Sequence, residues 1–169
     1  DRAYGRVLRA EWVFGSFARV KSQNYKHAKS SGFSENIARE VALKPHLNIG
    51  VFALEANASH WEVWQKNLKI ALKSGKIWGS EQIAMNITIY HDGLNVEILP
   101  AYCNWTLTEA LRYDKKTNTL VETYLPNHQI GIVHFAGKNN DEIRNNKNFV
   151  SKIETTDGEF TEKKLRFIK

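Results

Sequence analysis

The stretch LNIGVFALEANASHWEVWQKNLKIALKSG, Leu47 to Gly75, places a nearly continuous apolar run directly before an amphipathic segment. Leu47 to Ala56 has the length and the unbroken apolar character of a strand that is covered on both faces. Ser59 and Glu62 have the spacing of a capping box, and the apolar residues after them recur every three or four positions. The sequence therefore predicts a strand at 47–56 and then a helix that ends near Gly75.

Helices and short strands are predicted on both sides of this stretch. Ser34 is a good N-cap residue and Pro45 stops a helix, so a short helix is predicted between them. A second helix is predicted from Ser80 to the turn HDG, because its apolar side chains recur on one face. Further strands are predicted at 95–100, 119–125 and 130–135.

The two ends of the chain show weaker patterns. Residues 1–33 admit a strand-turn-strand, and the polar tail 139–169 is predicted to be partly helical and partly loose. The alternation of strands and helices between these ends indicates an α/β domain with a mixed sheet flanked by helices. In such folds ligands bind beyond the carboxyl ends of the strands, so polar residues at those ends become site candidates.

The composition is that of a globular protein with a packed core. Of the 169 residues, 42% are apolar, 25% are charged and 11% are aromatic. The single cysteine, Cys103, excludes an internal disulfide and gives no support to a cysteine-based metal site. No stretch approaches the roughly 20 apolar residues of a membrane helix. The N-terminus lacks the apolar core of a signal peptide, so a cytoplasmic location is predicted.

The charge is unevenly distributed. The net charge is +6, and residues 1–47 hold nine Lys or Arg against four Asp or Glu. A basic excess favours anionic partners such as phosphates or an anionic membrane surface, and a solvated basic face is the simpler interpretation. Because the sequence has no arginine-glycine repeat, zinc finger or RNA-binding aromatic motif, no nucleic-acid partner is expected, whereas peripheral membrane contact stays open.

Several polar residues stand at predicted strand ends and helix starts. Asn48 opens the first predicted strand, and Gly50 permits the close approach of a ligand or another backbone segment. Glu81 and Gln82 lie in the first turn of the helix that begins at Ser80. The N–H groups of a helix start suit an anion or sugar hydroxyls, although a glutamate there is also ordinary capping chemistry.

Two later segments add candidates. The Asn104-Trp105 pair follows Leu-Pro in a predicted loop and can either pack or bind a sugar ring. In IGIVHFAGK, 130–138, His134 ends an apolar strand and Lys138 follows it closely. Imidazole can bind a divalent metal and lysine can hold phosphate, but a lone histidine is more often structural.

The order of these segments resembles the second half of glycosyltransferase family 8. That family has an N-x-G strand, a helix with tryptophan, a D-Q-D-x-L-N segment, an L-P-x-x-x-N segment, and a strand ending in H-x-x-G-x-x-K. The chain shows these motifs in the same order between residues 47 and 138. The matching residues are Asn48, Gly50, Gln82, Asn86, Leu99, Pro100, Asn104, Trp105, His134 and Gly137. In the D-Q-D-x-L-N segment, Glu81 stands in place of the first Asp and Ile83 in place of the second.

The resemblance implies a nucleotide-diphospho-sugar transferase fold. It implies transfer of a sugar, with retention and with Mn²⁺ or Mg²⁺, from a nucleotide-diphosphate sugar to an unidentified carbohydrate or lipid-linked acceptor. His134 would be a metal ligand, and Lys138 would neutralise the diphosphate. Glu81 would hold donor-sugar hydroxyls, and Gln82 would lie beside the anomeric carbon. The remaining donor-binding residues would be Asn48, Gly50, Asn104 and Gly137.

The chain also departs from the family pattern. It contains no D-x-D motif, and Lys138 follows Gly137 directly, whereas the family's lysine comes three residues after the glycine. The nucleotide-binding first half of the fold would lie upstream of Asp1. We therefore expect residues 1–169 to form a single α/β domain that is the C-terminal portion of a larger glycosyltransferase domain, with a family-like core at 47–138. The alternative is a non-catalytic carbohydrate- or anion-binding module.

Overall fold

The computed structural model describes residues 10–74, 79–106, 110–135 and 141–165. The chain divides into two compact units, one within Arg6–Ile98 and the other within Leu99–Lys169. We call them the helical unit and the strand unit, because the four longest helices belong to the first and all the described strands to the second. The predicted α/β character is confirmed, whereas the prediction of a single domain over 1–169 stays a prediction.

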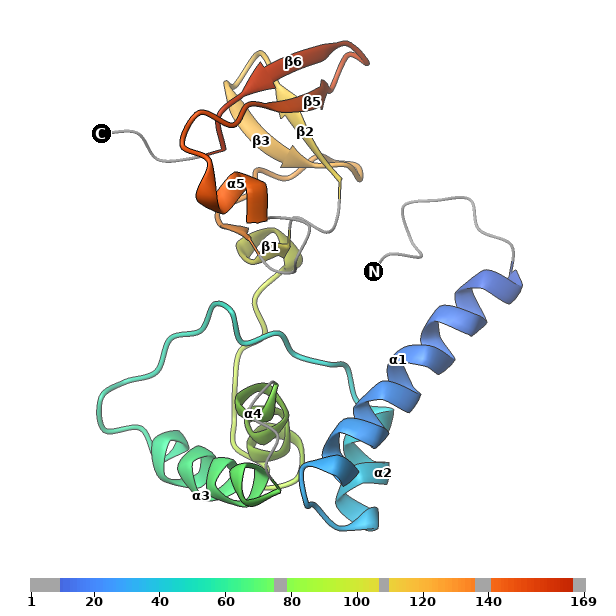
Figure 1. The fold of residues 1–169 in the computed structure, drawn as a ribbon, viewed down its shortest axis with the longest axis vertical. Coiled ribbons are helices and arrows are strands. Elements are labelled where there is room, and N and C mark those ends of the chain that lie inside the picture. Colours follow the sequence, from blue (N-terminus) through green and yellow to red (C-terminus); the bar gives the residue numbers. More distant parts are fainter. Residues whose placement is uncertain (1–9, 75–78, 107–109, 136–140, 166–169) are drawn as a thin grey trace. The chain divides into compact units, whose positions relative to one another are not determined.

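Two pairs of helices build the helical unit. Helix α1, Ala10–Ser30, lies beside α2, Glu35–Leu43, and α3, His60–Lys73, lies beside α4, Ser80–Tyr90 (Figure 1). Their facing sides bury small and branched side chains that form one apolar core. The buried members of this core are Ala28, Phe33, Ala38, Val41, Ala71, Ile83 and Ile87.

Local sequence signals explain where two of these helices begin. The hydroxyl of Ser34 accepts a hydrogen bond from the Ile37 N–H at 3.3 Å, so it caps α2 as predicted. Helix α4 starts after Gly79, whose φ of +75° favours glycine. Ser59 occupies the N-cap of α3 but makes no side-chain capping bond. The predicted stop of α3 at Gly75 lies outside the described residues.

The strand-turn-strand expected within residues 1–33 is wrong, because Ala10–Ser30 forms the long helix α1. The expectation gave too much weight to glycine as an interruption. Gly15 lies inside the helix, where a glycine costs only about 1 kcal/mol relative to alanine. Packing offsets that cost, since Ala28 near the end of α1 is fully buried in the core shared with α2.

The predicted strand at 47–56 is also wrong. This segment consists of turns and irregular backbone, and Phe52 leaves 45% of its surface exposed. No neighbouring strand pairs with the described main chain at Leu47, which bonds to a side chain instead. The side-chain oxygen of Asn86 accepts from the Leu47 N–H and its NH₂ group donates to the Leu47 carbonyl, both at 2.9 Å. The strand predicted at 95–100 is likewise absent, and Val96 and Ile98 there are exposed.

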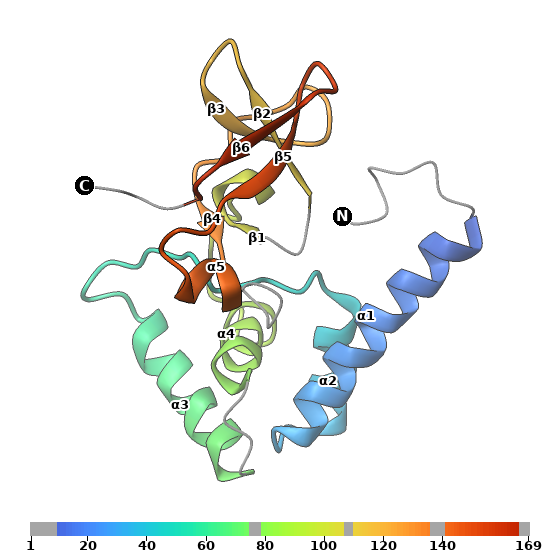
Figure 2. The ribbon, with the colours of Figure 1, turned by 45° about the horizontal axis from the view of Figure 1, so that its top comes forward.

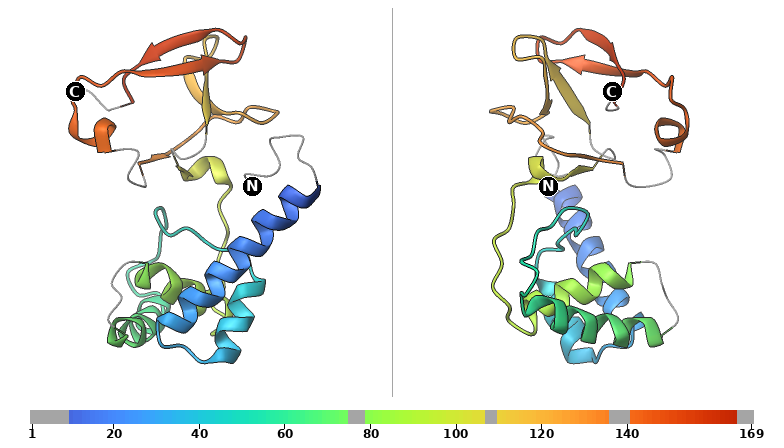
Figure 3. Two further views of the ribbon diagram at one scale, coloured as in Figure 1. Left: turned by 45° about the vertical axis from the view of Figure 1, so that its right-hand side comes forward. Right: turned by 90° about the vertical axis from the view of Figure 1, so that its left-hand side faces the viewer.

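The strand unit contains a mixed four-stranded sheet. The strands are β2, Leu111–Asp114, β3, Thr119–Glu122, β5, Ser151–Thr155, and β6, Phe160–Lys163, in the order β3-β2-β5-β6. Strands β2 and β5 are parallel, and the two outer pairs are antiparallel. Figure 2 and Figure 3 show the β2–β3 and β5–β6 hairpins of this sheet. A mixed sheet is therefore confirmed, although β3 is the one strand of it that the sequence patterns indicated.

A second, smaller strand pair carries the predicted histidine. Strand β1, Trp105–Thr106, runs parallel to β4, Val133–His134, and Thr106 is the register partner of His134. A 3₁₀ turn, Ala101–Cys103, precedes β1, and a short helix α5, Asp141–Asn145, precedes β5. The unit's core lies between these elements and consists of Trp105, Leu111, Tyr113, Ile130 and Ile153.

The strand predictions here are confirmed only in part. The strand expected at 119–125 exists as Thr119–Glu122, and the one expected at 130–135 is reduced to Val133–His134. The polar tail is partly helical as predicted, in α5, but it also forms the β5–β6 hairpin, which was not predicted. The hairpin has a T-D-G turn in which Gly158 has a φ of +87°.

Candidate functional site

The buried amide of Asn86 organises the candidate residues of the helical unit. Besides its two bonds to the main chain of Leu47, Asn86 donates to the carbonyl of Gln82 at 2.8 Å, and only 2% of its surface is exposed. One side chain thus satisfies three main-chain groups. It fastens the segment that contains Asn48 to the first turns of α4.

Gln82 points its side chain at the same segment. Its amide nitrogen donates to Nε2 of His46, so Nε2 is the acceptor and the His46 ring is neutral in this arrangement. Burial, followed by the charge of His27, lowers the pKa of His46 from its ordinary value. The lowered pKa favours the neutral His46 ring that accepts from the Gln82 amide.

Asn48 and Gly50 form a local turn beside this contact. The side-chain oxygen of Asn48 accepts from the Gly50 N–H at 2.7 Å, and both residues are exposed. Glu81 has an exposed side chain, while its carbonyl accepts from Nε1 of Trp64 at 3.0 Å. Asn48 and Gln82, which are far apart in the sequence, therefore lie on neighbouring segments with polar atoms accessible to a ligand.

The strand unit brings Asn104 and His134 together. Nδ1 of His134 donates to the side-chain oxygen of Asn104 at 3.0 Å, across the parallel β1–β4 pair. With the proton on Nδ1, the second ring nitrogen, Nε2, presents a lone pair. A histidine that binds a metal through one nitrogen almost always donates from the other to an oxygen, which is the arrangement of this pair.

Trp105 packs in the core, and does not bind a sugar ring, the other role that the sequence left open. It is 95% buried in the core of the strand unit, where its ring lies 6.2 Å from that of Tyr124. Its main-chain N–H donates to the Ile132 carbonyl at 2.9 Å, which joins the start of β1 to the segment before β4. Trp105 therefore positions Asn104 for His134 and offers no stacking face to a sugar.

The structure gives one candidate metal ligand rather than a complete metal site. Across the described ranges, no group of three or more His, Cys, Asp or Glu side chains is arranged to hold a metal ion. His134 fits the role of a single ligand through Nε2. Gly137 and Lys138, predicted beside the diphosphate, lie outside the described residues.

Sequence reasoning missed the role of His46 in orienting Gln82. The two residues are 36 positions apart, and a lone histidine in a polar loop carries no spacing signal. Asn86 was matched to a family motif, but its contact with Leu47 was not foreseen. A strand at 47–56 would have formed its main-chain hydrogen bonds with a neighbouring strand, so no side-chain partner was expected. A contact between a side chain and a main-chain segment far away in the sequence produces no periodic pattern in the sequence.

The described helices include none that is long and apolar enough to cross a membrane. Comparisons with protein families, with curated proteins and with solved structures find no significant match to this chain. The described geometry is thus one polar contact in each unit: Gln82 bonded to His46, two residues before Asn48, and Asn104 bonded to His134.

Proposed function

We propose that this chain carries donor-binding residues of a retaining glycosyltransferase that uses a nucleotide-diphosphate sugar. The observation that supports this most is the 3.0 Å hydrogen bond between Asn104 and His134, two motif residues that stand 30 positions apart. The bond leaves Nε2 of His134 for a cation, which is the chemistry that the family resemblance implies for this residue. The proposed fold remains that of a nucleotide-diphospho-sugar transferase.

His134 would act at the diphosphate. A bound Mn²⁺ or Mg²⁺ supplies positive charge that offsets the charge growing on the departing diphosphate. Nε2 of His134 would be one protein ligand, and Asn104 would keep the imidazole in the required tautomer and orientation. Gly137 and Lys138 would contact the diphosphate, with Lys138 adding a second positive charge.

The family resemblance alone assigns Asn48, Gly50, Glu81 and Gln82 to the sugar of the donor. Asn48, Gly50 and Glu81 offer exposed amide, main-chain and carboxylate groups suited to sugar hydroxyls. Gln82 would place its amide beside the anomeric carbon. His46 accepts one amide N–H of Gln82, so the amide is oriented before the donor binds and loses little freedom on binding.

The proposal predicts hydrolysis of a nucleotide sugar when no acceptor is present. The full-length protein would be given Mn²⁺ with uridine-, guanosine- and cytidine-diphosphate sugars in turn, and released nucleoside diphosphate would be measured. Replacing His134 with alanine should lower Mn²⁺-dependent hydrolysis by about 100-fold, because a metal ligand is lost. His91→Ala is the matched control, since His91 contacts Glu40 on the surface of the helical unit and should leave the rate unchanged.

Equal rates for His134→Ala and the unmodified chain would contradict the assignment of His134. Complete absence of hydrolysis, together with glycan binding that ignores nucleotides, would favour the non-catalytic carbohydrate- or anion-binding module. One observation gives weight to that second function: among the described residues, no group of three or more His, Cys, Asp or Glu side chains could hold a metal ion. Calorimetry with nucleotide sugars and simple glycans separates the two functions.

A further inference from the structure

A hollow of about 390 Å³ lies at the start of α3 in the helical unit. The turn before the helix and the first helical turn line it, through Ala56, Asn57, Ala58, Trp61 and Glu62. The Ala58 N–H donates to the Glu55 carbonyl at 3.0 Å, and the Trp61 N–H to the Ala58 carbonyl at 3.1 Å. Main-chain bonds therefore hold the turn, and the two alanines leave the space open. The volume suits one sugar ring, and the hollow is shallow and open to solvent, so a ligand would lie against its wall.

The indole of Trp61 forms an exposed wall that is held in place. Its Nε1 donates to the Glu55 carbonyl at 2.8 Å, and its ring lies 6.2 Å from Phe52 and 5.8 Å from Trp64. The Trp61 residue nevertheless remains 37% exposed. Because its indole N–H is bonded to the Glu55 carbonyl, a ligand would meet the carbon atoms of the ring. A ring fixed in this way loses little conformational entropy when a ligand packs on it.

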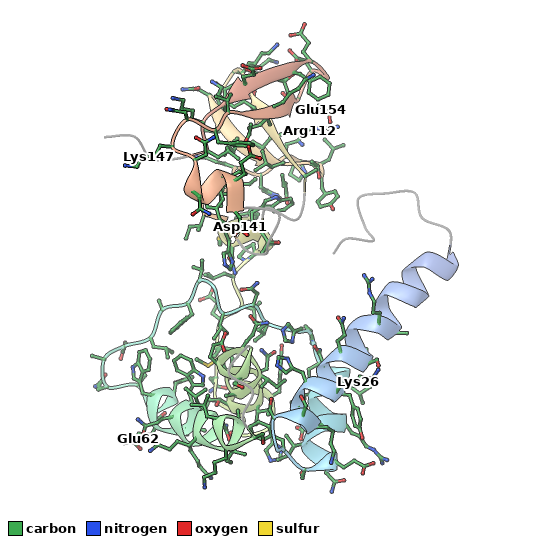
Figure 4. The ribbon with its side chains drawn as sticks, viewed as in Figure 1. Lys26, Glu62, Arg112, Asp141, Lys147 and Glu154 are labelled. Atoms are coloured by element: carbon green, nitrogen blue, oxygen red, sulfur yellow. The ribbon has the colours of Figure 1, made fainter. Side chains whose placement is uncertain are left out.

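The hollow combines this aromatic surface with an amide and a carboxylate. Asn57 and Glu62 are both exposed at its edge, and Figure 4 labels Glu62 on the first turn of α3. An aromatic face carries negative partial charge and attracts the C–H groups on one side of a sugar ring. Amide and carboxylate groups can exchange hydrogen bonds with the hydroxyls around that ring. We propose that this hollow binds a pyranose sugar, which stacks on Trp61.

Other ligand classes fit the lining less well. An organic cation is best bound by several rings that surround it, but among the described residues Trp61 is the one ring that lines the hollow, since Phe52 and Trp64 pack against Trp61 itself. Glu62 at the edge repels phosphates, so an anionic membrane surface or a nucleic-acid backbone is disfavoured. A neutral, hydroxylated ring is the ligand that uses the aromatic, the amide and the carboxylate together.

Within the proposed function, this sugar would be the acceptor of the transfer reaction. That identification rests on the proposed function. Sugar binding at Trp61 does not, because it needs neither a nucleotide nor a metal. The hollow lies on α3 and the turn before it, whereas the donor candidates of the helical unit lie around Leu47 and the start of α4. The two sites can therefore be tested by separate measurements on the same sample.

The test measures sugar binding in the absence of nucleotide. Tryptophan fluorescence and saturation-transfer NMR would be recorded with maltotetraose, cellotetraose and the methyl glycosides of galactose and N-acetylglucosamine. At least one probe should bind. Trp61→Ala should weaken binding by about 10-fold or more, and Trp61→Phe should retain most of it, because phenylalanine also presents a stacking face. Asn57→Ala should weaken binding several-fold through a lost hydrogen bond.

Gln65→Ala is the matched control, because Gln65 is exposed one turn further along α3 and does not line the hollow. Circular dichroism would establish that every variant keeps its helices. The inference is overturned if none of the probes binds, or if Trp61→Ala binds them as the unmodified chain does. Binding of choline or of phosphatidylcholine vesicles that depends on Trp61, without sugar binding, also overturns it. Sugar binding without nucleotide-sugar hydrolysis would leave this site standing while the proposed function fails.

Discussion

The two units hold their motif residues in physically different ways. In the helical unit, the Asn86 side chain is buried and all its described bonds go to main-chain groups of Leu47 and Gln82. In the strand unit, Asn104 and His134 are half-buried and bond to each other through their side chains. The first arrangement fastens a segment that has no strand partner. The second orients a ring whose other nitrogen presents a lone pair.

This difference separates structural from chemical roles among residues that look alike in the sequence. Asn86 and Asn104 both belong to short family-like motifs, yet only Asn104 contacts a side chain with metal-binding chemistry. Loss of Asn86 should therefore be measured as lost stability. Loss of Asn104 should be measured as lost activity.

The largest effect is expected for Asn86→Ala. The substitution removes three hydrogen bonds and leaves main-chain groups of Leu47 without their partner, which should lower the free energy of unfolding by about 3 kcal/mol. Urea unfolding followed by helical circular dichroism measures this change. Asn95→Ala, at an exposed position of the same unit, is the control and should change stability little. A loss below about 1 kcal/mol for Asn86→Ala would mean that Asn86 does not fasten the segment.

Asn104→Ala should act on catalysis. The His134 ring would lose the acceptor that fixes its tautomer, so Mn²⁺-dependent hydrolysis of the donor should fall by about 10-fold. The Mn²⁺ concentration needed for half-maximal rate should rise, whereas the unfolding midpoint should change little. Asn148→Ala, at an exposed position of the same unit, serves as the control. An unchanged metal dependence would remove Asn104 from the site.

Ser34→Ala should destabilise the helical unit by about 1 kcal/mol, because the Ile37 N–H loses its cap. Thermal unfolding of the helices gives the measurement. Ser34→Asp supplies an equivalent acceptor near the positive end of α2 and should restore the stability. If alanine and aspartate behave alike, the hydroxyl contributes nothing to the start of this helix.

The smallest effect is expected from the titration of His46. Its pKa is lowered in the folded chain, so the unfolded chain binds more protons as the pH falls through the ordinary value of about 6.5. The stability of the helical unit should therefore be highest above that pH and decline below it. His46→Gln, which keeps a side-chain acceptor for Gln82, should flatten this part of the stability profile. An identical acid decline in both chains would show that other groups cause it.

Local signals in the sequence predicted α2, α3 and α4, because a cap and an apolar stripe at helical spacing are properties of neighbouring residues. They failed for 47–56, where an apolar run resembled a buried strand but Phe52 remains exposed and Asn86 replaces the strand partner. They also missed β5 and β6, since short polar strands of a half-exposed sheet show little apolar alternation.

The candidate site could be predicted only as single residues. Motif order pointed to Asn104 and His134, and the β1–β4 register explains their contact, but strands of two residues are too short to show a pattern. The orientation of Gln82 by His46 depends on a contact between distant segments and has no local signal. The hollow at Trp61 could not be predicted, because Trp61 belongs to an apolar stripe and resembles a core residue in the sequence. In the structure Trp61 is partly exposed and lines the hollow.

The most direct test of the role of His134 is an NMR measurement of the six histidine side chains. Long-range ¹H–¹⁵N spectra would be recorded while small amounts of Mn²⁺ are added together with uridine, guanosine or cytidine diphosphate in turn. We predict that His134 carries its proton on Nδ1 and that its ring signals broaden first and most strongly with one of these nucleotides. Broadening that is absent, or equal for all six histidines, would contradict the assignment of His134 as the metal ligand.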